Sequence, residues 1–229
     1  FSLGSDNYAN ASTDDYVAYC FAEVDGYSKI GSYIANGSND GRKKEDAKDA
    51  LTMSGTKHFT EPWDDYELID AGGGKKLERW GEIITIRPEM QAYFHSGIPF
   101  DQWKKMAHWE FTEKKANKGA WKALKKNSPS TWDVSYGRLV FKLEITSNKH
   151  LGLFPEQKTN WEFIEDHLSS EEKFLNLFAY TGASSCVARH LGSDTYHLDS
   201  VKPIISWAKQ NMEKSRIMNI RWVHEDALK

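Results

Sequence analysis

The stretch from Phe174 to Asp199, FLNLFAYTGASSCVARHLGSDTYHLD, decides the fold of this chain. It begins as an apolar strand, turns at Gly182, continues as a short helix and returns as a second strand that ends in Asp199. A third strand is predicted from Ile220 to His224. Strand–helix–strand units of this length give parallel strands joined by right-handed crossovers. The stretch therefore predicts an α/β sheet that binds its ligand at the carboxyl ends of the strands.

The residues between these strands predict two helices. The first covers 184–191 and stops at Gly192, because glycine is the usual residue just after a helix. The second covers 200–215 and tolerates Pro203 in its first turn. A further short helix is predicted at 160–169, before the first strand.

Polar and flexible residues gather where the predicted strands end. Gly182 lacks a Cβ atom, so its backbone can take positive φ and approach a ligand closely. Asp199 ends an apolar strand, where its carboxylate needs hydrogen-bond donors. A ribose diol would supply two donors; alternatively, Asp199 caps the helix that begins at Ser200. Asp226 follows the third strand, either as a second ligand contact or as a solvent-facing acid.

Three motifs carry a resemblance to a known family: NLFAYTG at 176–182, Asp199-Ser200 at the start of a helix, and EDAL at 225–228. They resemble the start of a class I S-adenosyl-L-methionine (SAM)-dependent methyltransferase. The chain is most similar to the branch that contains the bacterial 23S rRNA cytosine-C5 methyltransferases, over about residues 63–229. The resemblance implies a Rossmann-like fold with SAM as cofactor, and methyl transfer to nucleic acid.

In the resembled family the glycine turn passes under the methionine end of the cofactor, the first acid holds the ribose, and the second lies by the adenine amino group. The candidate cofactor contacts implied for this chain are Asn176, Tyr180, Thr181, Gly182, Asp199, Ser200 and Asp226. The amide of Asn176 either lines the pocket or bonds to a neighbouring strand. Tyr180 and Thr181 are expected to shape the turn.

The resemblance implies no catalytic residue within this chain. The family's nucleophile and the loop that orients the target base lie beyond the third strand, so we expect an incomplete domain that is itself inactive. Cys186 follows the glycine turn on a helix and is expected to be a buried, unreactive packing residue. The histidines have no metal-ligand spacing, so no metal is expected.

The remaining sequence divides by composition. Residues 1–41 are rich in Gly, Ser, Asn, Asp and Tyr and resemble a segment of a phage lectin-like β-sandwich. Residues 42–62 are a charged linker, and 63–150 are a small β-rich (α+β) accessory module. The resemblance implies that residues 151–229 are the N-terminal half of the SAM-binding domain.

Within the accessory module the pattern predicts a hairpin of strands at 66–71 and 82–87 that turns at the glycines 72–74. Helix and loop are expected at 101–126, and a second hairpin within 134–146.

Residues 103–126 are rich in lysine and tryptophan, with eight lysines against two glutamates from 104 onwards. Lysines contact phosphate and aromatic faces stack on unpaired bases, so rRNA is a candidate partner here. The alternative is a core of tryptophans beneath a solvated lysine face. The net charge of −3 means that any RNA contact must come from such a local patch.

Composition bounds the remaining possibilities. With 39% hydrophobic residues and no apolar run of about 20 residues, the chain is expected to be globular and without a membrane span. Its two cysteines favour a reducing, cytoplasmic setting. Two other functions stay open: a noncatalytic RNA-binding module based on 103–126, and a phage or virion β-sandwich protein based on 1–41. The oligomeric state is not indicated.

Overall fold

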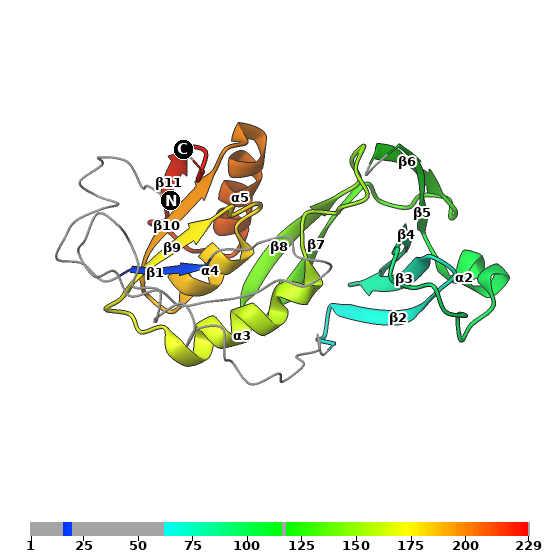
Figure 1. Ribbon diagram of the computed structural model, residues 1–229, viewed down its shortest axis with the longest axis horizontal. Coiled ribbons are helices and arrows are strands. Elements are labelled where there is room, and N and C mark those ends of the chain that lie inside the picture. The colour runs from blue at the N-terminus through cyan, green and yellow to red at the C-terminus, as the bar shows by residue number, and fades with distance from the viewer. Residues whose placement is uncertain (1–15, 20–61, 116–117, 229) are drawn as a thin grey trace. The chain divides into compact units, whose positions relative to one another are not determined.

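The computed structural model describes residues 16–19, 62–115 and 118–228 (Figure 1). The interpretations of residues 1–41 as a β-sandwich segment and of 42–62 as a linker lie almost entirely outside these residues. The exceptions are strand β1 (Tyr16–Tyr19) and residue 62. No helix in the described part of the chain is long and apolar enough to cross a bilayer.

The chain forms two compact units. Of the described residues, those within 60–155 make up the first unit, and those from 156 onwards together with 16–19 make up the second. A short 3-10 helix at Pro155–Gln157 lies where the chain passes from one unit to the other.

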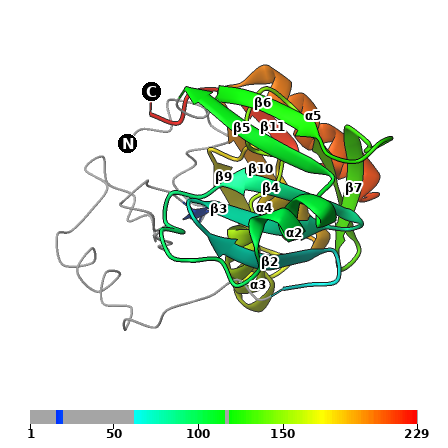
Figure 2. The same cartoon turned by 90° about the vertical axis from the view of Figure 1, so that its right-hand side faces the viewer.

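The 60–155 unit is built on a five-stranded sheet with the order β2-β3-β4-β5-β6 (Figure 2). Its strands are β2 (Tyr66–Gly72), β3 (Lys75–Trp80), β4 (Ile83–Pro88), β5 (Trp109–Lys115) and β6 (Lys118–Ala123). All neighbours are antiparallel except β4 and β5, which pair in parallel. Helix α2 (Phe100–Met106) joins these two strands, so the chain crosses over the sheet at this point.

A separate antiparallel hairpin completes the unit. It consists of β7 (Thr131–Tyr136) and β8 (Leu139–Glu144), and it confirms the hairpin predicted within 134–146.

Two predictions in this unit are wrong. Residues 75–80 form β3, so the chain makes three strands here instead of the single hairpin of 66–71 and 82–87. The strand was not predicted because its residues are largely charged, a pattern typical of an exposed loop. Glu78 can be buried in it because it forms an ion pair with Arg87. Residues 109–123 form the β5–β6 hairpin, and only the short helix α2 agrees with the helix and loop expected at 101–126.

The buried ion pair in the first sheet is bidentate. Arg87 Nε donates to Glu78 Oε2 and Arg87 Nη2 donates to Glu78 Oε1, both at 2.7 Å. The hydroxyl of Tyr66 also donates to Glu78 Oε1, at 3.1 Å. Burial acts to raise the pKa of Glu78, but the nearby cations and these hydrogen bonds lower it by more, so the carboxyl stays ionised.

The second unit contains a parallel sheet with the order β1-β9-β10-β11 (Figure 1). Its elements in the 156–229 part are α3 (Lys158–His167), β9 (Lys173–Leu177), α4 (Ala183–His190), β10 (Asp194–Asp199), α5 (Lys202–Lys214) and β11 (Arg221–His224). They confirm the strands and helices predicted for this part. Helix α4 packs between α3 and α5 and contacts β9 and β10.

Alternation along the strands separates two layers of side chains. Leu175 and Leu177 of β9 cluster with Tyr196 and Leu198 of β10. The residues between them point to the opposite face, because successive side chains on a strand alternate. That face meets α4, since Asn176 bonds Ser185 of that helix, and it holds the buried polar residues Asn176, Thr195 and His197.

Candidate functional site

The chain leaves β9 through a run of left-handed backbone. Phe178 has φ 52°, Tyr180 has φ 51° and Gly182, the residue that starts α4, has φ 81°. Non-glycine residues rarely adopt such angles, and strained loops of this kind cluster at ligand-binding sites. The turn lies at the carboxyl end of β9, where ligands of parallel sheets bind.

Gly182 is fixed as glycine by its surroundings as well as by its φ angle. A Cβ atom on this residue would lie 3.0 Å from Ala208 Cβ on α5. It would also lie 3.2 Å from His197 Cε1 on β10. The turn therefore packs directly on the following strand and helix, and no side chain fits between them.

Asp199 joins two loops at the edge of the sheet. Its Oδ2 accepts a hydrogen bond of 2.9 Å from the N–H of Tyr180, in the loop after β9. Its Oδ1 accepts one of 2.9 Å from the N–H of Val201, in the loop after β10. The carboxylate thus holds the glycine turn against the start of α5.

The carboxylate of Asp199 retains capacity for a ligand. An ionised carboxylate offers about four lone-pair sites, and the two loops use one on each oxygen. The side chain is partly exposed, so a ligand can reach it. One vicinal diol would match the two remaining acceptors. The alternative role as helix cap is not realised, because α5 begins at Lys202 after the N-cap residue Val201 and has no side-chain cap; Asp199 bonds only the N–H of Val201, before the helix.

Ser200 and Asp226 lie at the same edge of the sheet. Ser200 is exposed, and its carbonyl oxygen is 3.0 Å from His224 Nε2 at the end of β11. Asp226 is partly exposed, and its Oδ1 accepts a 3.0 Å bond from the N–H of Leu228. The edge therefore brings two acids, Asp199 and Asp226, to the ends of neighbouring parallel strands.

Asn176 lies inside the layer between the sheet and α4. Its side chain is buried, and Nδ2 donates a 2.9 Å hydrogen bond to Ser185 Oγ on α4. Ser185 Oγ is in turn 3.0 Å from His197 Nδ1 on β10. The three side chains form a hydrogen-bonded network beneath the glycine turn. His197 places the network there, because a Cβ atom at Gly182 would contact its ring.

His197 is uncharged in this position. Burial lowers the pKa of its imidazole to about 3. The ring stacks at a tilt on Trp222, with 4.7 Å between ring centres, and Nε2 has no hydrogen-bond partner within the described residues. His197 was not among the residues predicted for the site; a histidine inside an apolar strand was the only signal for it.

Thr181 is held through its backbone. Its carbonyl oxygen accepts a 2.9 Å hydrogen bond from Nδ2 of Asn211, a fully buried residue of α5. Asn211 was also missed, although a polar residue on the apolar face of a helix is a usable signal. The glycine turn is thus fixed by Asp199, by Asn211 and by the hydrogen-bonded network that includes His197.

Cys186 is a packing residue, as expected. It is buried on α4, and burial raises the pKa of its thiol to about 12. Across the part of the chain that the structure describes, no three His, Cys, Asp or Glu side chains lie close enough together to hold a metal ion.

The tryptophans of residues 103–126 serve the fold of the first unit. Trp103 is fully buried. Trp109 Nε1 donates to the carbonyl of Pro129, and Trp121 Nε1 donates to the carbonyl of Asn148, both at 2.9 Å. The described lysines of this segment are mostly exposed, so they are the groups that remain available to phosphate.

Residues 1–43 match a family described as a domain of unknown function, DUF7483. This description names no activity, and the lectin-like interpretation of residues 1–41 stays a prediction.

The chain is also similar to proteins named as methyltransferases. The chain is 31% identical over 88 residues to the ribosomal RNA large subunit methyltransferase K/L of Pseudoalteromonas translucida (strain TAC 125), covering 38% of the chain and 12% of the relative. It is 27% identical over 147 residues to the protein of the same name from Magnetococcus marinus (strain ATCC BAA-1437 / JCM 17883 / MC-1), covering 64% and 18%.

A solved structure extends this likeness to the fold. The SAM-dependent methyltransferase from Agrobacterium tumefaciens is 37% identical and superposes with a TM-score of 0.67, over 71% of this chain and 53% of that one. The fold is that of SAM-dependent methyltransferases. The resemblance to this broad group and the Rossmann-like α/β class are thereby confirmed. The chain spans about half the length of the solved methyltransferase and less than a fifth of the two ribosomal RNA methyltransferases.

Proposed function

We propose that this chain is part of a SAM-dependent methyltransferase that modifies ribosomal RNA, with C5 of a cytosine as the target atom. The cofactor is supported by the likeness to a SAM-dependent enzyme, and the substrate by the names of the ribosomal RNA methyltransferases. Ribosomal RNA as substrate also favours the cytoplasm as the location. Cytosine C5 rests on the resemblance of the motifs at 176–182, 199–200 and 225–228.

The observation that carries the proposal is the bridging carboxylate of Asp199. It fixes the glycine turn and the start of α5 while it keeps acceptor capacity for a ribose diol. Bound SAM would supply a methyl group made electrophilic by its sulfonium centre. In this proposal the backbone at Gly182 lies under the methionine end and Asp226 faces the adenine amino group.

The other candidate contacts have supporting roles. Tyr180 binds Asp199 through its N–H, and Thr181 is anchored by Asn211, so both shape the turn from the backbone. Asn176 acts from beneath through Ser185, and Ser200 begins the loop that leads into α5. Catalysis in such an enzyme depends on positioning the methyl group in line with its acceptor.

Calorimetric titration of the chain with SAM tests the cofactor site. Asp199→Ala removes an ionised acceptor, so we expect SAM affinity to fall roughly tenfold to a hundredfold. Asp194→Ala is the matched control, because Asp194 lies at the other end of β10 and pairs with Arg221 at 3.0 Å. Unchanged SAM affinity in the Asp199→Ala protein would refute the site.

The acceptor is tested with the complete enzyme that contains this chain. Ribosomal RNA methylated with labelled SAM is digested to nucleosides and analysed by mass spectrometry. We expect 5-methylcytidine; a different methylated nucleoside would overturn the cytosine C5 part of the proposal and leave the cofactor site intact.

A further inference from the structure

The loop between β4 and α2 displays apolar side chains to solvent. Tyr93 is 90% exposed, Met90 is 85% exposed and Phe94 is 53% exposed. The rings of Tyr93 and Phe94 meet edge to face, with 6.3 Å between their centres. Single exposed apolar residues are ordinary, but a contiguous group of them marks an interaction surface.

This loop is held firmly in spite of its exposure. The carboxylate of Asp70 accepts hydrogen bonds from the N–H of Gly97 at 3.1 Å and the N–H of Ile98 at 2.6 Å. The backbone N–H of Gly73 donates to the carbonyl of Phe94 at 2.8 Å. A rigid loop presents its side chains without an ordering cost when a partner binds.

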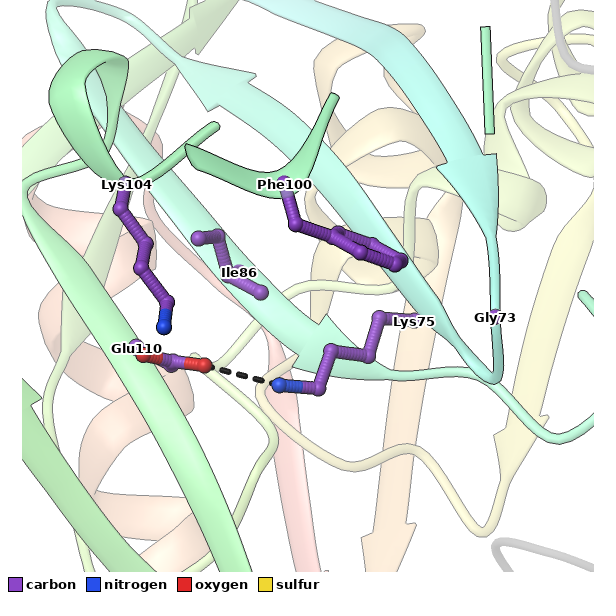
Figure 3. A pocket seen from close by; sticks show the side chains of 6 residues that line it. All are labelled: Gly73, Lys75, Ile86, Phe100, Lys104 and Glu110. Atoms are coloured by element: carbon purple, nitrogen blue, oxygen red, sulfur yellow. Dashed lines mark hydrogen bonds and ion pairs between the residues drawn. The ribbon is translucent and has the colours of Figure 1, made fainter. Parts of the chain in front are cut away.

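A pocket of about 170 Å³ lies within the 60–155 unit, and it is linked to the loop through Gly73, whose N–H bonds the carbonyl of Phe94 (Figure 3). The residues that line it are Gly73, Lys75, Ile86, Phe100, Lys104 and Glu110. In Figure 3 the side chains of Phe100 and Lys104 descend from α2, while Lys75 and Glu110 approach each other from the sheet below. The pocket is smaller than the roughly 300–1,000 Å³ of whole-ligand sites, so it suits a single flat ring system.

Phe100 forms a fixed wall of the pocket. Its ring meets Trp103 edge to face at 4.8 Å, and Trp103 Nε1 donates to Asp70 Oδ2 at 3.1 Å. On the other side, a Cβ on Gly73 would lie only 2.7 Å from Phe100 Cζ, so the glycine makes room for the ring. Phe100 nevertheless keeps 42% of its surface exposed, which leaves part of its ring open to a partner.

The pocket combines one acceptor with an excess of cations. Lys75 Nζ and Glu110 Oε1 form an ion pair of 2.8 Å, and Lys104 adds a second positive charge. Lys122 is paired directly with Glu110 across the β5–β6 hairpin, so the two side chains share a face of the sheet. This surface is therefore complementary to an anionic strand.

We infer that this pocket binds one unpaired base of the RNA substrate, stacked on Phe100, with its exocyclic amino group donating to Glu110 and its phosphate at Lys104. The inference rests on the proposed function, since it takes RNA as the substrate. Aromatic faces accept any base, whereas a carboxylate accepts a hydrogen bond only from a base that carries an amino group. Tyr93 and Phe94 extend the stacking surface to the neighbouring nucleotide.

Fluorescence anisotropy of the full 229-residue chain with labelled, unstructured oligonucleotides tests this site. Oligocytidine should bind more tightly than oligouridine, because uracil has no amino group for Glu110. Phe100→Leu keeps an apolar side chain against Trp103 but removes the aromatic face, and we expect roughly fivefold weaker binding or more. Glu110→Gln should narrow the difference between the two oligonucleotides.

Two lysines of α2 provide a matched pair of variants. Lys104→Ala should lower the slope of log affinity against log salt by roughly 0.7 to 1, as expected for one lost phosphate contact. Lys105 is also exposed on the same helix, lies 3.8 Å from Asp101 Oδ2 and does not line the pocket, so Lys105→Ala should leave the slope unchanged.

The outcomes separate this inference from the proposed function. Equal RNA affinity for wild type and Phe100→Leu, equal slopes for the two lysine variants, or no RNA binding at all would each overturn the base pocket. The same holds if a duplex binds as tightly as the single strand. Asp199→Ala should weaken SAM binding and leave RNA affinity unchanged. If Phe100→Leu weakens RNA binding as expected but the wild-type chain binds no SAM, the cofactor site alone is refuted.

Discussion

Replacing Gly182 with alanine tests whether the turn after β9 is shaped by packing. Left-handed backbone at a non-glycine residue costs about 1–2 kcal/mol. The new Cβ would also lie 3.0 Å from Ala208 Cβ and 3.2 Å from His197 Cε1, closer than carbon atoms normally approach. Overpacking of this kind costs about 1–3 kcal/mol, so we expect Gly182→Ala to destabilise the 156–229 unit by about 2–5 kcal/mol.

Hydrogen exchange read by mass spectrometry is the appropriate assay, because it reports on each unit separately. Peptides from β9, α4 and β10 should lose protection in the Gly182→Ala protein. Gly137→Ala is the control: Gly137 has φ 56° in the β7–β8 turn, and a Cβ there would meet nothing within 4 Å. Gly137→Ala should lower the stability of the 60–155 unit only by the cost of left-handed backbone, about 1–2 kcal/mol.

A second substitution isolates the steric contribution. Ala208→Gly removes the nearest carbon, so the double variant should recover part of the stability that Gly182→Ala loses, after allowance for the glycine in α5. The reasoning fails if Gly182→Ala costs no more than Gly137→Ala, or if Ala208→Gly recovers nothing. In either case the turn would tolerate a side chain, and the proposal that it is a close-packed platform for a ligand would lose its steric argument.

Two further predictions concern buried ionisable groups. Burial lowers the pKa of His197 to about 3, so below pH 6.5 only the unfolded chain takes up this proton, and stability falls as the pH decreases. The 156–229 unit should lose about 2 kcal/mol between pH 6.5 and pH 5, measured by hydrogen exchange in urea, and His197→Asn should remove this loss. In the other unit, Glu78→Gln leaves the buried Arg87 without its counter-ion and should cost about 3–5 kcal/mol. The exposed pair Glu67–Arg79 is the comparison, since Glu67→Gln should cost at most about 1 kcal/mol; equal losses for the two glutamates would contradict the burial argument.

The parallel sheet was predictable because its signals are local. Each strand is a short apolar run, Gly192 ends α4, and Pro203 lies in the first turn of α5. Asp199 was identified as either a ligand contact or a helix cap; in the structure α5 begins later, at Lys202, with no side-chain cap, and Asp199 bonds the loop residues Tyr180 and Val201. Local sequence patterns are enough to predict a helix or strand when the residues that begin and end it lie within or next to it.

The rest depended on contacts between residues distant in sequence. Strand β3 resembles a charged loop until Glu78 is paired with Arg87, nine residues later. The link from Asn176 through Ser185 to His197 joins a strand, a helix and the next strand, and no periodicity predicts such a chain. Burial of polar groups is decided by their partners, which a single sequence does not reveal.

In the loop between β4 and α2, the residues that Asp70 anchors differ from the residues that are exposed to solvent. The one carboxylate of Asp70 anchors Gly97, Ile98 and Trp103, so the path of the chain there does not depend on the outward side chains of Met90 and Tyr93. Those side chains are free to be exchanged without rebuilding the scaffold beneath them. Selection for a new recognition target could therefore act on this loop one surface residue at a time, at little risk to folding.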